Sequence, residues 1–299
     1  MGRALVRQLL SGASPAHTLT VWSRDATAAR ELFTRDLGAA KARDLKFVQP
    51  SSGSTDADAV VHLAGQKLNF SRTWNAESER VIRDSRVLTA RQILQSLSAP
   101  PKVWISASAV GWYGLKTDLS ALHVESEAPA TDFTGRICQA VEAEAGEAAK
   151  RGARTVCLRL GVVLANDAGG ALEQMATPVS MFVGAPIGSG KQDVPCVHVE
   201  DAAAAFRFAL DNALEGAFNL VAPEHVNNEQ MTQAIARVLG RPLLVPFNVP
   251  GFVLTTALGD FAQLALEGSR VSSQKLRDAG FTFQFAGVDG ALRDLLARK

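Results

Sequence analysis

Cysteine, aromatic residues and net charge are all scarce in this chain. Of 299 residues, three are cysteines, 6% are aromatic, and 31 Lys and Arg face 30 Asp and Glu, which leaves a net charge of +1. Three separated cysteines without a CxxC pair cannot form a disulfide framework, so we expect a reducing compartment, cytoplasmic or organellar, rather than secretion. Binding to nucleic acids or anionic membranes requires a basic surface, which a near-neutral chain lacks. We therefore expect a small-molecule partner.

Long hydrophobic runs are also missing. The hydrophobic stretch 242–267, which has no basic residue, contains Pro246, Pro250 and Asp260, and these disfavour a bilayer-spanning helix. No charged start followed by an apolar segment marks a secretory signal at the N-terminus. We therefore predict a soluble protein that neither crosses nor binds a membrane.

Motifs of hydrolases and metal sites are absent as well. There is no GxSxG sequence, and the five histidines form no HxxH or HExxH pair. The segment 184–191, GAPIGSGK, departs from a phosphate-binding loop because Ala185 replaces its first glycine and Gln192 follows its lysine. Nucleotide hydrolysis and metal catalysis are therefore not expected.

Up to about residue 165, short apolar runs alternate with stretches of helical period. This pattern is typical of a parallel sheet with crossover helices. The expected strands are 18–22, 45–48, 59–63, 103–107 and 156–163, and the expected helices are 2–10, 26–33, 73–97 and 135–150. We predict an α/β fold with a Rossmann-type, doubly wound parallel sheet.

Beyond residue 165 the pattern changes to a turn-rich break, a Gly-dense loop and mostly helical segments. Further strands are expected at 196–199 and 216–221. We predict that 1–165, completed by 199–221, forms a dinucleotide-binding domain. Residues 166–198 and 222–299 would then form a smaller, mostly helical substrate lobe.

Several side chains have structural roles as their default interpretation. Asp201 is placed to cap the Ala-rich helix after strand 196–199, with His198 as a hydrogen-bonding neighbour. The glutamates of 142–147 are expected on a solvated helix face. Phe281 and Phe283 alternate as in a half-buried strand, which predicts core packing for both.

Ser23 and Arg24 follow the strand 18–22, where a dinucleotide-binding fold meets the adenosine ribose of its cofactor. An acidic residue there would pair with the ribose hydroxyls of NAD, whereas Ser and Arg can hold the 2′-phosphate of NADP. Taken alone, an Arg after a strand is more often a solvated surface charge. Its interpretation therefore depends on the surrounding fold.

Small residues and hydroxyls follow two other expected strands. Leu63, Ala64 and Gly65 end the strand 59–63, and small residues at that point let a ligand approach the backbone. The segment 106–114, SASAVGWYG, contributes two serines and the only tyrosine of the chain. Its hydroxyls can orient a nicotinamide or polarise a substrate oxygen, and the tyrosine can act as an acid or base if its pKa is lowered. The alternative for the tyrosine is packing under the Gly-rich turn.

The order of these motifs resembles the epimerase-like branch of the atypical extended short-chain dehydrogenase/reductases, relatives of the sugar-nucleotide epimerases. The resemblance runs over nearly the whole chain, through VWSR, HLAG, the pair Ser85 and Arg86, SASAVGWYG, RLGVVLA, GAPIGSGKQ, HVED, VAPEHVNNEQ and KLRDAGFTF. It implies a Rossmann fold, NADP(H) as cofactor, and a small C-terminal domain of unknown function at about 247–299.

The resemblance also implies roles for individual residues. The cofactor-binding positions that it implies are Ser23, Arg24, Leu63, Ala64, Arg86 and Val163. The strand-end interpretation adds Gly65 and Ser106, and Gly2 matches the third glycine of the family's GxxGxxG turn. The predicted catalytic residues are Ser108, which matches the serine of the superfamily, and Tyr113.

This sequence departs from the family pattern in three places. Only the third glycine of the turn is present, so we expect the natural protein to begin roughly ten residues earlier, with a further strand. The Tyr-x-x-x-Lys pair is missing, with Phe133 and Thr134 near the tyrosine position and Cys138 near the lysine position. Asp193 follows Gln192 where epimerases often carry an Arg for a nucleotide diphosphate. The leading hypothesis is an NADP-dependent oxidoreductase or epimerase-like enzyme with an unknown small substrate; the alternative is a non-catalytic NADPH sensor or scaffold.

Overall fold

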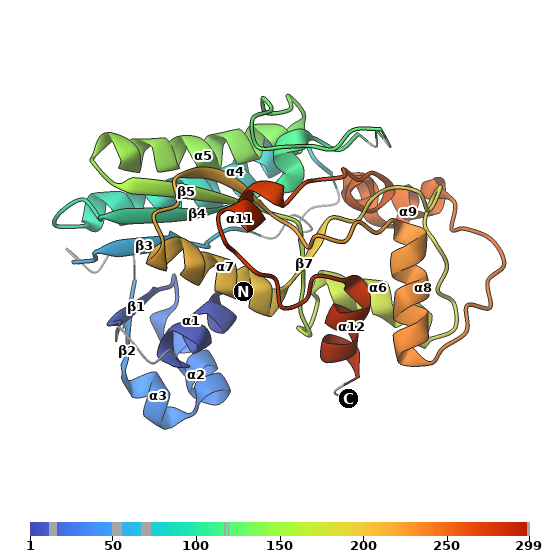
Figure 1. Ribbon diagram of the computed structural model, residues 1–299, viewed down its shortest axis with the longest axis horizontal. Helices are drawn as coiled ribbons and strands as arrows, with labels where there is room; N and C mark the ends of the chain where they lie inside the picture. The colour runs from blue at the N-terminus through green and yellow to red at the C-terminus, as the bar shows by residue number, and fades with distance from the viewer. Residues whose placement is uncertain (12–16, 50–55, 67–72, 117, 119, 298–299) are drawn as a thin grey trace.

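The computed structural model describes residues 1–11, 17–49, 56–66, 73–116, 118 and 120–297 (Figure 1). Its centre is a parallel sheet with strand order β3-β4-β5-β8. The four strands are β3 (Ala59–His62), β4 (Val103–Ala109), β5 (Arg154–Leu160) and β8 (Gly216–Leu220). This arrangement confirms the predicted α/β class.

Helices cover both faces of this sheet. On one face, α4 (Ala76–Ser96) and α5 (Phe133–Lys150) bury apolar side chains against Val60, Trp104 and Cys157. On the other, α1 (Gly2–Ser11) and α7 (Val199–Asp211) pack on Ile105 and Leu158. Since both faces are covered, the central strands are apolar on both sides, as in other parallel sheets.

Two smaller parallel sheets flank the central one. Strands β1 (Leu19–Trp22) and β2 (Leu45–Val48) pair beside α2 (Ala26–Leu37) and α3 (Ala39–Arg43). Strands β6 (Val162–Leu164) and β7 (Cys196–His198) form the third sheet. The expected strand 156–163 divides at Gly161, where an added Cβ would lie 2.4 Å from the Pro195 carbonyl oxygen, so only glycine permits this backbone approach.

The rest of the chain is mostly helical and has a core of its own. Its helices are α6 (Ala171–Ser180), α8 (Asn228–Leu239), α9 (Gly251–Leu258), α10 (Gln263–Leu266), α11 (Gln274–Asp278) and α12 (Val288–Leu296), with a 3-10 turn at Gly259–Ala262. The buried faces of α6, α8 and α12 pack together in the second core. Figure 1 shows α6, α8, α9 and α12 beside the sheet, whereas α11 packs against the sheet through Leu276. Within the described ranges, no helix is both long and apolar enough to cross a membrane.

The predicted role of Asp201 as a helix cap is wrong. His198 is the N-cap of α7, and its Nδ1 accepts a hydrogen bond from the Glu200 backbone N–H at 3.1 Å. The buried Asp201 carboxylate instead accepts from the backbone N–H groups of Gln284 at 2.7 Å and Phe285 at 2.8 Å. Asp201 therefore attaches the C-terminal segment to the Rossmann domain.

Phe281 and Phe283 are buried, which confirms their predicted core role, but they do not form a strand. Their rings meet edge to face with centroids 4.9 Å apart, inside the core beneath α7. The turn predicted before them is present, with Gly280 at φ +97. The alternation of Phe281 and Phe283 therefore reflects the packing of their two rings in the core and not a β-strand.

Candidate functional site

The site begins with a row of polar residues across the central sheet. Ser108 on β4 is in register with Arg159 on β5, which is in register with Asn219 on β8. Residues in register on neighbouring strands point to the same face, so the three polar side chains lie together. All three are buried, although they interrupt apolar strands.

Glu142 of α5 lies over this row, and its carboxylate balances the charge of Arg159. Ser108 Oγ donates to Glu142 Oε1 at 2.7 Å. Arg159 Nε donates to the same oxygen at 2.9 Å, and its Nη2 donates to Glu142 Oε2 at 3.0 Å. Burial alone would lower the pKa of Arg159, but the hydrogen bonds with Glu142 outweigh it and raise that pKa above its ordinary value.

Tyr113 completes the network from the turn after β4, the 3-10 segment Val110–Tyr113. Arg159 Nη1 donates to the Tyr113 hydroxyl at 3.1 Å, and that hydroxyl donates to Asn219 Oδ1 at 2.7 Å. Burial raises the pKa of Tyr113 to about 12, in spite of the opposing effect of Arg159. Tyr113 stays a predicted catalytic residue, but its proton is bound more tightly than in free tyrosine.

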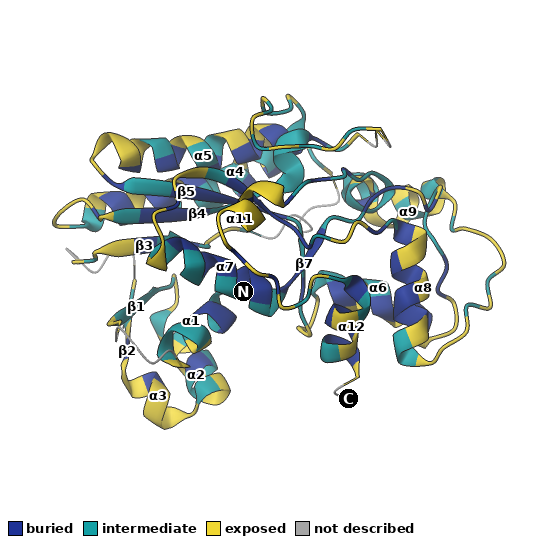
Figure 2. Ribbon diagram, in the orientation of Figure 1, coloured by how far each residue is buried: buried dark blue, intermediate teal, exposed yellow. Residues whose placement is uncertain are grey.

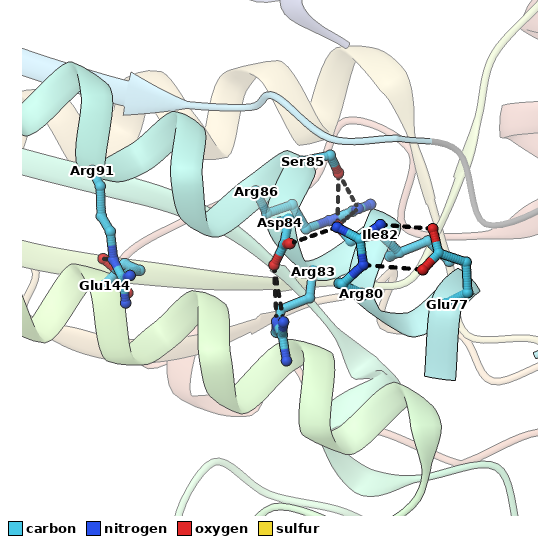
Figure 3. A network of polar contacts seen from close by, with 9 residues as sticks. All are labelled: Glu77, Arg80, Ile82, Arg83, Asp84, Ser85, Arg86, Arg91 and Glu144. Carbon is cyan, nitrogen blue, oxygen red and sulfur yellow. Dashed lines mark hydrogen bonds and ion pairs between the residues drawn. The ribbon is translucent and has the colours of Figure 1, made fainter. Parts of the chain in front are cut away.

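The predicted solvated face of 142–147 is therefore wrong for two of its glutamates. Glu142 is held by Arg159, and the buried Glu144 binds Arg91 of α4, whose Nη2 lies 2.7 Å from Glu144 Oε1 (Figure 3). Only Glu147 is exposed as expected, paired with Lys150. Helical period alone could not show that α5 turns these carboxylates toward the sheet and α4.

Arg86 of α4 lies at the carboxyl end of β3. A Cβ added to Gly65 would sit 2.7 Å from Arg86 Cζ, so the missing side chain of Gly65 makes room for the guanidinium. Arg86 Nη1 donates to the Ile82 carbonyl at 3.0 Å and contacts Ser85 Oγ at 3.3 Å (Figure 3). Among the described residues Arg86 has no carboxylate partner, and burial lowers its pKa. A partly buried cation without an acidic partner attracts anions, so the cofactor-binding role of Arg86 stays a prediction.

His62 lies beside Arg86 at the end of β3. It is 3% exposed, its ring centre lies 6.0 Å from that of Trp104 with the ring planes tilted by 36°, and its Nε2 has no hydrogen-bond partner among the described residues. Burial and the charge of Arg86 lower the pKa of His62 to about 4. His62 is therefore neutral at physiological pH.

Cys138 of α5 lies where the superfamily carries its lysine. Its thiol donates to the Ala109 carbonyl at 3.5 Å, and a Cβ on Gly111 would lie 3.5 Å from the sulfur. Burial raises the pKa of Cys138 to about 12. A neutral thiol cannot supply the positive charge by which a lysine lowers the pKa of a nearby phenol.

The structure brings Gly2 and Leu63 together. A Cβ on Gly2 would contact Leu63 Cδ1 at 3.7 Å, which places the N-terminus of α1 at the carboxyl end of β3. Helix N-termini attract anions through their free N–H groups and dipole. The roles of Gly2 and Leu63 in cofactor binding stay predictions.

Ser23 and Arg24 lie between β1 and α2. Ser23 Oγ donates to the Asp25 carbonyl at 2.9 Å, and Asp25 caps α2 by accepting from the Ala28 N–H. Arg24 is exposed and forms no ion pair with the described residues. It is free to meet a phosphate at the start of α2.

The other predicted cofactor positions, Ser106, Val163 and Ala64, lie on β4, on β6 and after β3. Ser106 is 1% exposed, and its hydroxyl accepts from Trp104 Nε1 at 2.8 Å. Val163 on β6 packs partly buried on the central core, and Ala64 is exposed after β3. Their contacts with a cofactor stay predictions. The described part of the chain holds no group of three or more His, Cys, Asp or Glu arranged for a metal ion.

A parallel sheet covered by helices on both faces, with polar groups at the carboxyl ends of its strands, is typical of Rossmann-type folds, the class to which the short-chain dehydrogenase/reductases belong. The model of the NAD dependent epimerase/dehydratase family matches residues 1–227, and a domain of unknown function, DUF1731, matches residues 249–295. The chain belongs to the NAD dependent epimerase/dehydratase family.

Similar proteins come from plants, bacteria and animals. The chloroplastic epimerase family protein SDR39U1 homolog of Arabidopsis thaliana is 34% identical, covering 99% of this chain and 84% of the relative. The epimerase family protein YfhF of Bacillus subtilis is also 34% identical, with 89% of each chain covered. The structure of human epimerase family protein SDR39U1 isoform 2 with NADPH has a TM-score of 0.83 at 27% identity, covering 100% of this chain and 96% of the human one.

Sequence reasoning missed three members of the polar network: Glu142, Arg159 and Asn219. Arg159 carried a signal, because a charged residue within the apolar run 156–164 requires a buried partner. Asn219 carried a weaker one of the same kind. The partner, Glu142, could be identified only once α5 was placed over the sheet.

Proposed function

We propose that this protein binds NADP(H) and uses it as an oxidoreductase or epimerase on a small-molecule substrate. The observation that carries the proposal is Arg86, a partly buried cation without a carboxylate partner in the described part of the chain, beside the exposed Gly65. The N-terminus of α1 beside Leu63 supplies a second anion-binding element. The similarity to a human protein whose structure contains NADPH supports the same cofactor.

The preference for NADP over NAD rests on Ser23 and Arg24. Both follow β1, where the adenosine ribose lies in Rossmann folds, and no acidic side chain precedes Asp25, which is engaged in capping α2. In the Arg24→Asp variant we expect NADPH affinity to fall at least about tenfold while NADH affinity is retained, since a new carboxylate would repel the phosphate. Calorimetric titration of both cofactors measures this.

Arg35→Asp is the matched control, because Arg35 is an exposed residue near the other end of α2. It makes the same charge change and should leave both affinities unaltered. Equal NADPH affinity in the wild-type chain and in Arg24→Asp would contradict the role of Arg24. Absence of NADPH binding by the wild-type chain would contradict the proposal as a whole.

A second candidate function is a non-catalytic NADPH sensor or scaffold. It is favoured by Cys138 at the position of the catalytic lysine and by the hydroxyl of Tyr113, which is held by Arg159 and Asn219 with a pKa of about 12. Hydride exchange between bound NADPH and a panel of carbonyl compounds and sugar nucleotides separates the two functions. Turnover supports the enzyme, and binding without turnover over the whole panel supports the sensor.

A further inference from the structure

A short segment of the C-terminal domain packs against the part of the chain that carries Tyr113. The segment comprises residues 268–272, between α10 and α11, and we call it the clasp. It lies within the domain of unknown function at residues 249–295. Figure 1 shows the chain crossing here from the helical part of the molecule to the sheet, where α11 begins. No clasp residue is exposed, so the clasp is packed among other parts of the chain (Figure 2).

The clasp pairs with the segment after Tyr113 through a short parallel bridge. The His123 N–H donates to the Arg270 carbonyl at 2.9 Å, and the Ser272 N–H donates to the His123 carbonyl at 2.9 Å. Val271, between these two clasp residues, is fully buried. Both backbone groups of His123 are therefore engaged by the C-terminal domain, which fixes the position of this residue.

His123 in turn covers Tyr113. Their rings stack with centres 4.9 Å apart and planes tilted by 17°. His123 Nδ1 lies 2.8 Å from Glu127 Oε2, which fixes the orientation of the imidazole. Ser269 of the clasp adds a contact nearby, because its hydroxyl donates at 3.3 Å to the carbonyl of Gly114, the residue after Tyr113. One face of the Tyr113 ring is thus closed by a side chain that the clasp holds in place.

Asn219 connects the clasp with the hydroxyl of Tyr113. It is fully buried on β8. Its Oδ1 accepts from the Tyr113 hydroxyl at 2.7 Å, and its Nδ2 donates to the Ser272 carbonyl at 3.0 Å. An amide has one accepting end and one donating end, so the bond to Ser272 turns the accepting end toward the phenol. The Ser272 carbonyl thereby fixes the direction of the hydrogen bond that the Tyr113 hydroxyl makes.

We propose that the C-terminal domain sets the orientation of Tyr113 and its access to water, and that His123 and Asn219 are the positioning residues through which it acts. The domain then completes the candidate active site. The inference deepens the proposed function, on which it rests in one respect: Tyr113 is the predicted catalytic acid or base. The contacts between the clasp and Tyr113 need no cofactor, so the two proposals can be tested separately.

Exclusion of water is the measurable effect of the clasp. Burial is the main reason why the pKa of Tyr113 is raised to about 12. The charged groups beside the phenol are Arg159 and Glu125. Arg159 is held by Glu142 and not by the clasp. Loosening the clasp should therefore admit water while this cation stays in place, and the pKa of Tyr113 should fall toward its ordinary value near 10.

The test is a titration of Tyr113, the only tyrosine, by phenolate absorbance in a stopped-flow pH jump that is read before alkaline unfolding. Ser272→Pro removes the N–H that donates to His123, and Val271 already has the extended conformation that a residue before proline prefers. We expect its midpoint at least about one pH unit below that of the wild type, a tenfold weaker hold on the proton. Ser272→Ala keeps the N–H and should titrate as the wild type does.

His123→Ala is a second variant, which leaves the backbone of the clasp unchanged. It removes the ring over Tyr113 and should lower the midpoint by at least about one pH unit. His123→Phe restores a stacked ring and should restore the wild-type midpoint. Circular dichroism at pH 8 shows whether each variant is folded. If Ser272→Pro does not fold, Val271→Ala replaces it, since this change removes only two buried methyl groups from the clasp and should lower the midpoint in the same direction.

Three results would overturn the inference. The first is a folded clasp variant that titrates with the wild type. The second is a fall in His123→Ala alone, which would mean that His123 covers Tyr113 without the C-terminal domain. The third is a loss of NADPH binding in Ser272→Pro, because Arg24 and Arg86 lie before α2 and on α4 and a local change in the clasp should not reach them. A wild-type chain that does not bind NADPH would contradict the proposed function, and the titration would still decide the role of the clasp.

Discussion

Arg159 and Glu142 form a bidentate ion pair inside the protein, with N–O distances of 2.9 and 3.0 Å and side-chain exposures of 3% and 12%. The pair joins β5 to α5 and also holds the hydroxyls of Ser108 and Tyr113. One salt bridge thus positions both predicted catalytic hydroxyls. Its contribution is geometric, because desolvation offsets much of the attraction between two buried charges.

Removing one partner of this pair should destabilise the fold strongly. Glu142→Gln leaves the Arg159 charge buried without a carboxylate, and we expect a loss of about 3–5 kcal/mol in the free energy of unfolding. The paired replacement Glu142→Leu/Arg159→Met removes both charges and should recover most of that loss. Urea denaturation measures both variants.

Glu147→Gln serves as the control, because Glu147 is exposed on the same helix and pairs only with Lys150. It should hardly change the unfolding midpoint. If Glu142→Gln behaved like Glu147→Gln, the buried network would not contribute to stability as inferred.

Tyr113 should titrate well above the ordinary range for a phenol. It is the only tyrosine of the chain, so the near-ultraviolet absorbance of phenolate reports this residue alone. We expect a midpoint near pH 12 in the folded protein and near pH 10 in urea. Because the folded pKa is raised, the unfolded chain loses its proton first and stability falls as pH rises from about 10 to 12.

The same titration bears on catalysis. Tyr113 can act as an acid or base only if its pKa is lower once cofactor is bound. The positive charge of oxidised nicotinamide would lower that pKa. A midpoint that stays near pH 12 with NADP⁺ bound would argue for a structural tyrosine. A folded midpoint near pH 10 without cofactor would show that water reaches the Tyr113 hydroxyl in the folded protein.

His62 should make the protein sensitive to acid. Its pKa is lowered to about 4 in the fold, against about 6.5 in the unfolded chain, so the unfolded chain takes up the proton first. The stability is complete above pH 6.5 and falls as pH drops toward 4, by about 3 kcal/mol in total. His62→Leu should remove this part of the pH dependence of the unfolding free energy.

His17→Gln provides the comparison, because His17 is exposed. It should leave the pH dependence of the wild type unaltered. Chemical denaturation at pH 7 and pH 4.5 distinguishes the two variants, and an equal loss of stability in His62→Leu and the wild type would refute the assignment.

The pattern of the sequence predicts most of the sheet but little of the network inside it. Alternation of short apolar runs and helical periods locates β1, β2, β3 and β4 within a few residues, since each strand is a short apolar run between helical segments. The partners of Arg159 and Asp201 come from segments that are distant in the sequence and meet only in the folded protein. Glu142 is a helix residue of ordinary spacing, and Gln284 contributes only a backbone N–H, so neither has a local signature.

Arg86 allows stability and cofactor binding to be separated. Its guanidinium has no carboxylate partner in the described part of the chain, so Arg86→Met removes a desolvated charge and keeps an apolar stem in its place. We expect the free energy of unfolding without cofactor to be unchanged or higher.

The response of this variant to NADPH should be weaker. A ligand at 100 times its dissociation constant stabilises a fold by about 2.7 kcal/mol, and a tenfold loss of affinity removes about 1.3 kcal/mol of that effect. Thermal unfolding of Arg86→Met and the wild type, each with and without NADPH, therefore compares how much NADPH stabilises the two proteins. Arg83→Met is the control: Arg83 lies three residues before Arg86 on α4, and its guanidinium is already paired with Asp84 (Figure 3). This variant should preserve the full NADPH response. A loss of stability in Arg86→Met together with an intact NADPH response would make Arg86 a structural residue, and the anion site would then have to be sought at the start of α1.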